Sequence, residues 1–167
     1  MSNLEIRPAQ PADSAAIKQL AIATGLFMPE EMDGFDEMLS GFFDGSMPDH
    51  RWLVLQRPGE SIAGAAYYAP EPFADRVWNL YFIAVAPEQQ GSGTGKALIS
   101  YVERQLRTLG EDTARVLIVE TSGRDKFERT RRFYQSHGFD EEARIREYYG
   151  PSDDKVVFGK SLVAMAT

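Results

Sequence analysis

The sequence of 167 residues contains no cysteine and only two histidines, His50 and His137. Without thiols, the chain has no thiol catalysis, no disulfide framework and no cysteine-bound zinc. A metal centre built on several histidines is hard to assemble from two, so we expect no metal site. No stretch approaches the roughly 20 apolar residues that a membrane-spanning helix requires, so we also expect no membrane partner.

Basic residues are scarce relative to acidic ones. There are 18 lysines and arginines against 25 aspartates and glutamates, which gives a formal net charge of −7. This balance argues against a broad nucleic-acid-binding surface, so no nucleic-acid partner is expected. Residues Met1–Glu5 show neither the basic nor the apolar region of a signal peptide, and we therefore expect a cytoplasmic protein.

The rest of the composition, with 43% hydrophobic and 26% charged residues, is typical of a globular protein. The length predicts one domain over residues 1–167. Hydrophobic periodicity predicts strands followed by strand–helix–strand units, which indicates a mixed α/β (α+β) sheet. Strands are expected at Leu4–Arg7, Arg51–Gln56, Ile62–Ala69, Arg76–Val85 and Val116–Val119, then around Phe139 and at Lys155–Leu162. Helices are expected from Pro11 to Gly25, from Pro29 to Phe42, from Ala97 to Leu109 and from Phe127 to Ser136.

The most informative segment is a glycine-rich stretch that joins the strand ending at Val85 to the helix containing Ala97. Its alternating glycines, Gly91, Gly93 and Gly95, remove Cβ atoms, so the backbone can curl and approach a ligand closely. The first turn of the following helix offers free N–H groups and a partial positive charge. We therefore expect a phosphate or diphosphate ligand here.

Two familiar phosphate-binding motifs do not fit this segment. A Walker A loop would need glycine where Gln90 stands and a hydroxyl where Ala97 stands, so ATP hydrolysis is disfavoured. A dinucleotide fingerprint that starts at Gly91 would need glycine at Lys96. A phosphotransferase function is therefore disfavoured, and an observation of magnesium-dependent ATP binding would be needed to support it.

A third pattern does fit. Gln90-x-x-Gly93-x-Gly95 follows a strand and opens a helix, and Tyr134-x-x-x-Gly138-Phe139 lies at a suitable distance downstream. Together these motifs resemble the GNAT superfamily of N-acetyltransferases, and the resemblance extends over nearly the whole chain. It implies a mixed, mostly antiparallel central sheet, flanked by about four helices and split between strands four and five. Those strands would be Arg76–Val85 and Arg115–Glu120.

The resemblance also implies roles for individual residues. Backbone N–H groups of the loop would bind the pyrophosphate of acetyl-CoA, and one strand end would pair with the pantetheine amides. The loop residues are Gln90, Gly91, Ser92, Gly93, Thr94 and Gly95, with Lys96 adding charge, and the strand residues are Ile83, Ala84 and Val85. Tyr134 occupies the position of the general acid, which supplies a proton or hydrogen bond to the departing thiolate. A tyrosine packed on a helix beside Phe133 is the structural alternative.

The general base is left open by the sequence. Some family members use a carboxylate on the fourth strand, but Arg76–Val85 contains neither aspartate nor glutamate. Glu120, at the end of the next strand, is the nearest acidic candidate. A structural hydrogen bond between Glu120 and a Thr121-Ser122 turn is an equal alternative, and a water chain is a further candidate for the base. Many members also carry asparagine seven residues before the tyrosine, where this chain has Phe127, so Thr130 or Arg131 would have to compensate.

The sequence thus predicts acetyl transfer from acetyl-CoA to a primary amine, by direct attack in a ternary complex without a covalent enzyme intermediate. The alternative is a non-catalytic acyl-CoA-binding sensor or partner-binding module. The acceptor would be a small-molecule or peptide amine, and acidic residues near the second helix would suit a cationic one. A homodimer is common in the family. The basic run from Arg124 to Arg132 is interpreted as a solvated helix face, and His50 and His137 as surface residues near turns.

Overall fold

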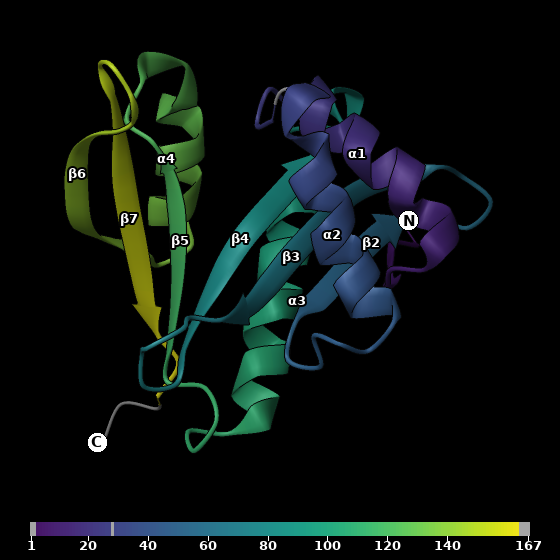
Figure 1. Ribbon diagram of the computed structural model, residues 1–167, viewed down its shortest axis with the longest axis horizontal. Helices are drawn as coiled ribbons and strands as arrows, with labels where there is room; N and C mark the ends of the chain where they lie inside the picture. Colours follow the sequence, from purple (N-terminus) through teal and green to yellow (C-terminus); the bar gives the residue numbers. More distant parts are fainter. Residues whose placement is uncertain (1–2, 28, 164–167) are drawn as a thin grey trace. The chain divides into compact units, whose positions relative to one another are not determined.

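The computed structural model describes residues 3–27 and 29–163 (Figure 1). Met1, Ser2, Met28 and residues 164–167, which belong to the expected domain, lie outside this described part. The strands are β1 (Glu5–Pro8), β2 (Arg51–Gln56), β3 (Ile62–Pro70), β4 (Val77–Val85), β5 (Val116–Ser122), β6 (Asp140–Gly150) and β7 (Asp153–Ser161). The helices are α1 (Ser14–Ala23), α2 (Met32–Phe43), α3 (Thr94–Leu109) and α4 (Glu128–Ser136). Short 3₁₀ turns precede the helices or the loop, at Pro11–Asp13, Pro29–Glu31, Pro87–Gln89 and Asp125–Phe127.

The seven strands hydrogen-bond in the order β1-β2-β3-β4-β5-β7-β6. The β4–β5 pair is parallel, whereas the β1–β2, β2–β3, β5–β7 and β6–β7 pairs are antiparallel. The parallel register runs from Val77↔Val116 to Leu80↔Val119. The expected mixed, mostly antiparallel sheet with four helices is therefore confirmed. None of the helices in the described ranges is both long and apolar enough to span a bilayer.

The chain forms two compact units. One comprises Met1–Ala69 and Phe82–Val102, and the other comprises Pro70–Tyr81 and Glu103–Thr167. The chain passes from one unit to the other at the end of β3, within β4 and within α3, so β4 and α3 each contribute several residues to both units.

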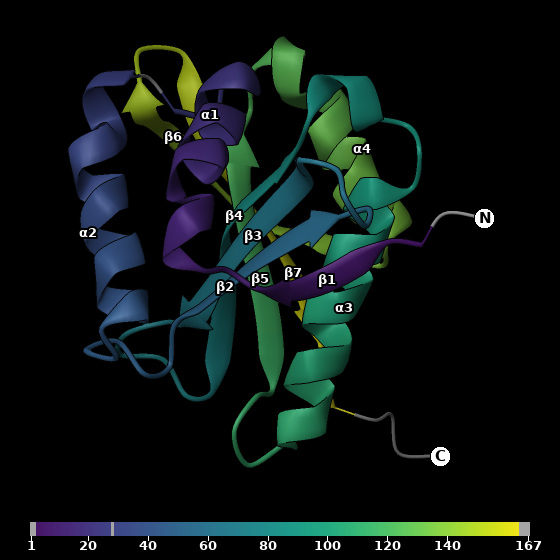
Figure 2. The same ribbon diagram turned by 90° about the vertical axis from the view of Figure 1, so that its right-hand side faces the viewer.

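In the first unit, α1 and α2 lie side by side and cover one face of β2 and β3 (Figures 1 and 2). The aromatic centre of this core is Phe35, whose ring lies 5.2 Å from Trp52 and 5.4 Å from Phe82. The N-terminal part of α3 packs on the other face, where a Cβ added to Gly64 would lie 2.9 Å from Leu98 Cδ1. A larger residue would require the Leu98 side chain to shift, so glycine favours the close approach of α3 to β3.

In the second unit, α4 packs against one face of β5 and β7. Tyr134 of α4 contacts Phe158 of β7 with 5.8 Å between ring centroids, and Phe158 pairs in register with Val119. Because side chains alternate along a strand, Val119 points towards α4, whereas its neighbour Glu120 points to the opposite face. The apolar face is thus the core of the unit, and the opposite face carries polar side chains.

The sequence missed most of β6. Only Phe139 and a polar connection were expected there, but Asp140–Gly150 is an eleven-residue strand that pairs with β7. Its side chains are exposed from Asp140 to Tyr149, so no alternation of apolar and polar residues marks it. Two irregularities in its register, together with its charges, are typical of an edge strand. The expected Thr121-Ser122 turn is also wrong, because β5 continues through Ser122.

Candidate active site

The glycine-rich loop joins β4 to α3 within the first unit. Gly91 and Gly93 have φ angles of 82° and 87°, the left-handed region that glycine adopts most easily. A Cβ added to Gly93 would have no atom within 4 Å, so the need for glycine comes from the backbone angle rather than from crowding. The loop backbone therefore curls at an open position of this unit.

Side chains of the loop hold its conformation. The Ser92 hydroxyl donates to the Gln89 carbonyl and lies 3.0 Å from Thr94 Oγ1. Arg57 Nη1 donates to Gln89 Oε1 at 2.8 Å, which ties the loop to the β2–β3 turn. These contacts fix the loop before any ligand arrives, which lowers the entropic cost of binding.

The backbone N–H groups expected to bind a pyrophosphate differ in their present partners. The N–H groups of Gln90 and Ser92 donate to carbonyls within the turn, at 3.4 and 3.3 Å. Thr94, Gly95 and Lys96 open the 16-residue helix α3, and helical geometry leaves the first N–H groups of a helix without an intrahelical acceptor. The start of α3 therefore offers readier donors than the turn before it.

The strand end before the loop has two kinds of residue. Ala84 is buried in the core of the first unit, whereas Ile83 and Val85 are half-buried. The Val85 carbonyl accepts a hydrogen bond from Gln90 Nε2 at 3.3 Å. Gln90 thereby links the loop to the strand that precedes it.

Tyr134 lies on α4 in the second unit and is 3% exposed. Its ring contacts Phe133, Phe139 and Phe158, with centroid distances of 5.6, 5.9 and 5.8 Å. Burial raises the pKa of the Tyr134 phenol above its ordinary value of 10.0, because the phenolate would be poorly solvated. The hydroxyl is therefore protonated at neutral pH and is able to donate a proton or a hydrogen bond.

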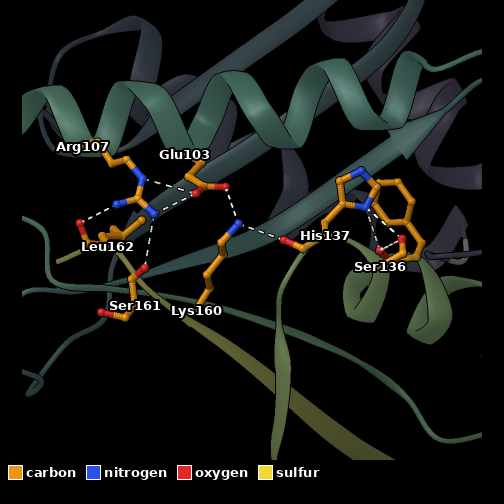
Figure 3. Close-up of polar contacts among 8 residues, drawn as sticks. Glu103, Arg107, Ser136, His137, Lys160, Ser161 and Leu162 are labelled. Atoms are coloured by element: carbon orange, nitrogen blue, oxygen red, sulfur yellow. Dashed lines mark hydrogen bonds and ion pairs between the residues drawn. The ribbon is translucent and has the colours of Figure 1, made fainter. Parts of the chain in front are cut away.

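A polar network holds the C-terminal end of α4 in place (Figure 3). Lys160 Nζ of β7 donates to the His137 carbonyl at 2.8 Å and to Glu103 Oε2 at 2.9 Å. Arg107 donates to Glu103 Oε1 at 2.9 Å and to the Leu162 carbonyl at 2.7 Å. We call Glu103, Arg107 and Lys160 the Glu103 cluster. Burial alone would raise the pKa of Glu103, but the hydrogen bonds from Lys160 and Arg107 outweigh it and lower that pKa.

The N-terminal end of α4 is held by one residue of the basic run. Arg131 Nη1 donates to the carbonyls of Ser122 and Arg124, both at 2.8 Å, and so ties α4 to the end of β5. Arg132, one residue on, forms an exposed ion pair with Glu128 at 2.7 Å. The interpretation as a solvated face is therefore wrong for Arg131 and agrees with the position of Arg132.

Both histidines differ from the expectation of surface positions. His50 is half-buried and its Nδ1 hydrogen-bonds to the Tyr67 hydroxyl, while the Tyr67 ring stacks on Trp52 at 4.5 Å. Burial lowers the pKa of His50. His137 is also half-buried, with its Nδ1 2.8 Å from the Phe133 carbonyl. Each histidine is thus part of the packing of its own unit.

Glu120 belongs to a second polar group, on the face of the second unit's sheet away from α4. Asn79 of β4, which is 1% exposed, donates through Nδ2 to Glu71 Oε1 at 2.6 Å and to Glu120 Oε1 at 3.3 Å. Lys155 Nζ lies 3.0 Å from Glu120 Oε2. We call Glu71, Asn79, Glu120 and Lys155 the Asn79 cluster. Glu120 therefore bonds to Asn79 and Lys155, and the alternative interpretation of a hydrogen bond to a Thr121-Ser122 turn is wrong.

Residues 48–141 match the GNAT acetyltransferase domain. The chain belongs to the GNAT acetyltransferase family. A GNAT-family protein from Desulfovibrio desulfuricans is 33% identical, with 96% of this chain and 99% of that chain covered at a TM-score of 0.86. A search of curated protein sequences finds no match.

More distant GNAT proteins share the fold. The ribosomal-protein-S18-alanine N-acetyltransferase from Escherichia coli is 20% identical and has a TM-score of 0.77. A Salmonella typhimurium protein, whose structure contains its cofactor acetyl-CoA, is 21% identical with the same TM-score. Each match covers 98% of this chain and 96% of the other. The strand order and the four helices are therefore those of a GNAT domain throughout.

The expected site residues of this GNAT chain fall into both units. Ile83–Val85 and the loop from Gln90 to Lys96 lie in the first unit, and Glu120 and Tyr134 lie in the second. Within the second unit, Glu120 and Tyr134 belong to opposite faces of the sheet, because α4 covers the face that bears Val119. Residues 3–27 and 29–163 contain no group of three or more histidine, aspartate or glutamate side chains arranged to hold a metal ion.

Sequence reasoning missed the partners of Glu120. Asn79 is an amide within an otherwise aliphatic and aromatic strand, and that was the available signal. Nothing in the sequence indicates that Glu71 or Lys155 lies near Asn79 and Glu120. Phe127 stands where many GNAT proteins carry asparagine. It is the last residue of the 3₁₀ turn before α4, and its ring lies 5.1 Å from Lys126 Nζ.

Proposed function

We propose that this GNAT protein transfers an acetyl group from acetyl-CoA to a primary amine, by direct attack in a ternary complex. The observation that carries the proposal is the loop from Gln90 to Lys96. It is open at Gly93, curled by two left-handed glycines and followed by a 16-residue helix. A helix start of this kind binds phosphate groups through N–H donors and the helix dipole. The Salmonella typhimurium relative, whose structure contains acetyl-CoA, supports the choice of ligand.

The residues present fit the diphosphate of acetyl-CoA. The N–H groups of Thr94, Gly95 and Lys96 would bind its oxygens, and the exposed Lys96 ammonium would add positive charge. The backbone of Ile83 and Val85 would pair with the pantetheine amides as an added strand does. Acetyl-CoA supplies an acyl group on a thiolate leaving group. Everything else in the reaction consists of holding the amine and moving its proton.

Tyr134 would act as the proton donor. Its raised pKa keeps the phenol protonated, so it can donate a hydrogen bond or proton to sulfur when the thiolate departs. Glu120 would accept the proton of the attacking amine, directly or through water. Its carboxylate is held on one oxygen by Asn79 and on the other by Lys155, which fixes its orientation.

Calorimetry with acetyl-CoA and CoA tests the proposal, with ATP–magnesium and NAD as control ligands. We expect micromolar binding of the CoA species alone. Gly93→Ala should weaken this binding, because alanine is strained at a φ of 87°. Gly59→Ala is the matched control: its φ is 78°, nothing lies within 4 Å of the added Cβ, and it lies on the β2–β3 turn. Equal CoA affinity in both variants, or no CoA binding by the native protein, would overturn the proposal.

An amine screen with detection of free thiol then tests turnover. The same assay, run as a pH–rate profile, tests the base. Because glutamine cannot accept a proton, Glu120→Gln should lower turnover and alter the pH–rate profile, and an unchanged profile would exclude Glu120. CoA binding without turnover on any amine would favour the acyl-CoA sensor instead.

A further inference from the structure

Two carboxylates converge on a single buried amide in the second unit. Asn79 Nδ2 donates to Glu71 at 2.6 Å and to Glu120 at 3.3 Å. Asn79 is almost completely buried, and Glu71 and Glu120 are half-buried. The amide thus holds two groups of like charge close to each other, at the meeting point of the β3–β4 connection, β4 and β5.

The amide is only half satisfied. Asn79 Oδ1 is buried and has no hydrogen-bond partner among the residues that the structure describes. A buried acceptor without a donor costs free energy of folding, so its presence calls for an explanation such as a ligand that supplies the donor. Oδ1 belongs to the same amide group as the Nδ2 that donates to both carboxylates.

The charges of the cluster do not cancel. Glu71 and Glu120 carry two negative charges, and Lys155, 3.0 Å from Glu120, supplies one positive charge. One negative charge is left beside a free carbonyl. The cluster therefore lacks one cation that donates hydrogen bonds.

A primary ammonium group has this chemistry, since it carries one positive charge and three N–H donors. Three oxygen acceptors are available to it: a carboxylate oxygen of Glu71, one of Glu120, and Asn79 Oδ1. We propose that Glu71, Asn79 and Glu120 form a binding site for the alkylammonium group of the amine acceptor. This inference rests on the proposed function and assigns the recognition of the acceptor to these three residues.

The site also favours a monovalent over a divalent cation. The Lys155 ammonium already pairs with Glu120, so it would repel the additional positive charge of a divalent cation. Glu71 belongs to the connection between β3 and β4, where Pro72 to Asp75 are exposed, so a rotation of its side chain to meet a ligand disturbs no strand.

Nuclear magnetic resonance on the full chain tests the site directly. The side-chain amide signal of Asn79, assigned by its loss in Asn79→Leu, is followed while n-butylammonium chloride is added at pH 7. We expect a saturable shift. The neutral isostere n-butanol and sodium chloride at equal ionic strength should give none.

Matched variants then test the contribution of charge. Glu71→Gln should weaken n-butylammonium binding about tenfold, because it replaces a charged acceptor by a neutral one. Glu111→Gln, which removes an exposed carboxylate elsewhere in the second unit, should leave the affinity within about twofold. Calorimetry on the same samples should show unchanged CoA binding in both variants.

Several results would overturn the inference. They are an equal shift with n-butanol or sodium chloride, equal affinities of Glu71→Gln and Glu111→Gln, and a tighter saturable response to magnesium chloride. A saturable n-butylammonium shift in a protein that binds no CoA would overturn the proposed function and leave the ammonium site standing. CoA binding without any n-butylammonium shift would do the reverse.

Discussion

The second unit contains two polar clusters built on the same plan, one on each face of its sheet. Each contains a lysine of β7 that pairs with a glutamate of a neighbouring element: Lys160 with Glu103, and Lys155 with Glu120. The two lysines are five positions apart, so they point to opposite faces of the strand. Their distances to the carboxylates, 2.9 and 3.0 Å, are nearly the same.

The clusters differ in what is left over. In the Glu103 cluster, one carboxylate is shared by Lys160 and Arg107, and the remaining donors reach carbonyl oxygens of His137 and Leu162. In the Asn79 cluster, two carboxylates share one amide donor, Lys155 pairs with Glu120, and a buried acceptor has no donor within the described residues. In the first arrangement each of the three side chains has polar partners, so we call it the complete cluster, and it suits a structural role. The second lacks a cation, which suits binding.

The largest effect is expected at Tyr134, which lies on α4, the helix whose C-terminal end the Glu103 cluster holds in place. Tyr134→Phe should lower turnover about a hundredfold, because the departing thiolate loses its proton donor. CoA affinity should change little, since the phenyl ring keeps its packing against Phe139 and Phe158. Steady-state kinetics with free-thiol detection and calorimetry measure the two effects.

Tyr101→Phe is the control for loss of a tyrosine hydroxyl. Tyr101 is half-buried on α3 in the first unit, and its variant should retain native turnover. Native turnover in Tyr134→Phe would remove this residue from the mechanism and leave it as a packed aromatic of the α4 core.

A smaller effect is expected on the free energy of unfolding, which should fall more when the Glu103 cluster is disrupted than when the Asn79 cluster is. Lys160→Met should lower the free energy of unfolding by about 2 kcal/mol, because the His137 carbonyl and one Glu103 oxygen lose a charged donor. Asn79→Leu should cost less than about 1 kcal/mol, because it also deletes an unsatisfied acceptor. Urea denaturation of both variants measures the difference. A larger loss in Asn79→Leu would mean that the Asn79 cluster is mainly structural.

The sequence predicted the elements whose local patterns are strong. The hairpin of Arg51–Gln56 with Ile62–Ala69 is confirmed, because both runs are apolar and a Pro-Gly turn separates them. The strand β6 was missed, because an exposed edge strand has no buried face to impose alternation on its residues. The alternation of apolar and polar residues predicts a strand where one face is buried, and β6 buries almost none of its side chains.

The candidate site shows the same division. The loop from Gln90 to Lys96 is continuous in sequence, so its glycine spacing is visible before the fold is known. The Asn79 cluster joins residues separated by 8 positions, from Glu71 to Asn79, and by 41 positions, from Asn79 to Glu120. Only the β4–β5 pairing brings the last two together, and no local pattern encodes that pairing. Their roles, like those of the loop and Tyr134, stay predictions until the experiments above are made.

The smallest effect concerns the acid stability of the complete cluster. The folded-state pKa of Glu103 is lower than its ordinary value of 4.5, because the bonds from Lys160 and Arg107 outweigh the effect of burial. The unfolded chain therefore binds the proton more readily than the folded chain. The stabilisation is present above pH 4.5 and is lost as the pH falls through the folded-state pKa. Glu103→Gln lacks this dependence, so the difference in free energy of unfolding between native protein and variant should narrow from about pH 6 to about pH 3. Glu128→Gln, which breaks the exposed pair with Arg132, should show a nearly constant difference over that range. Urea denaturation at several pH values measures both, and a constant difference for Glu103→Gln would show that its ion pairs contribute nothing to acid stability.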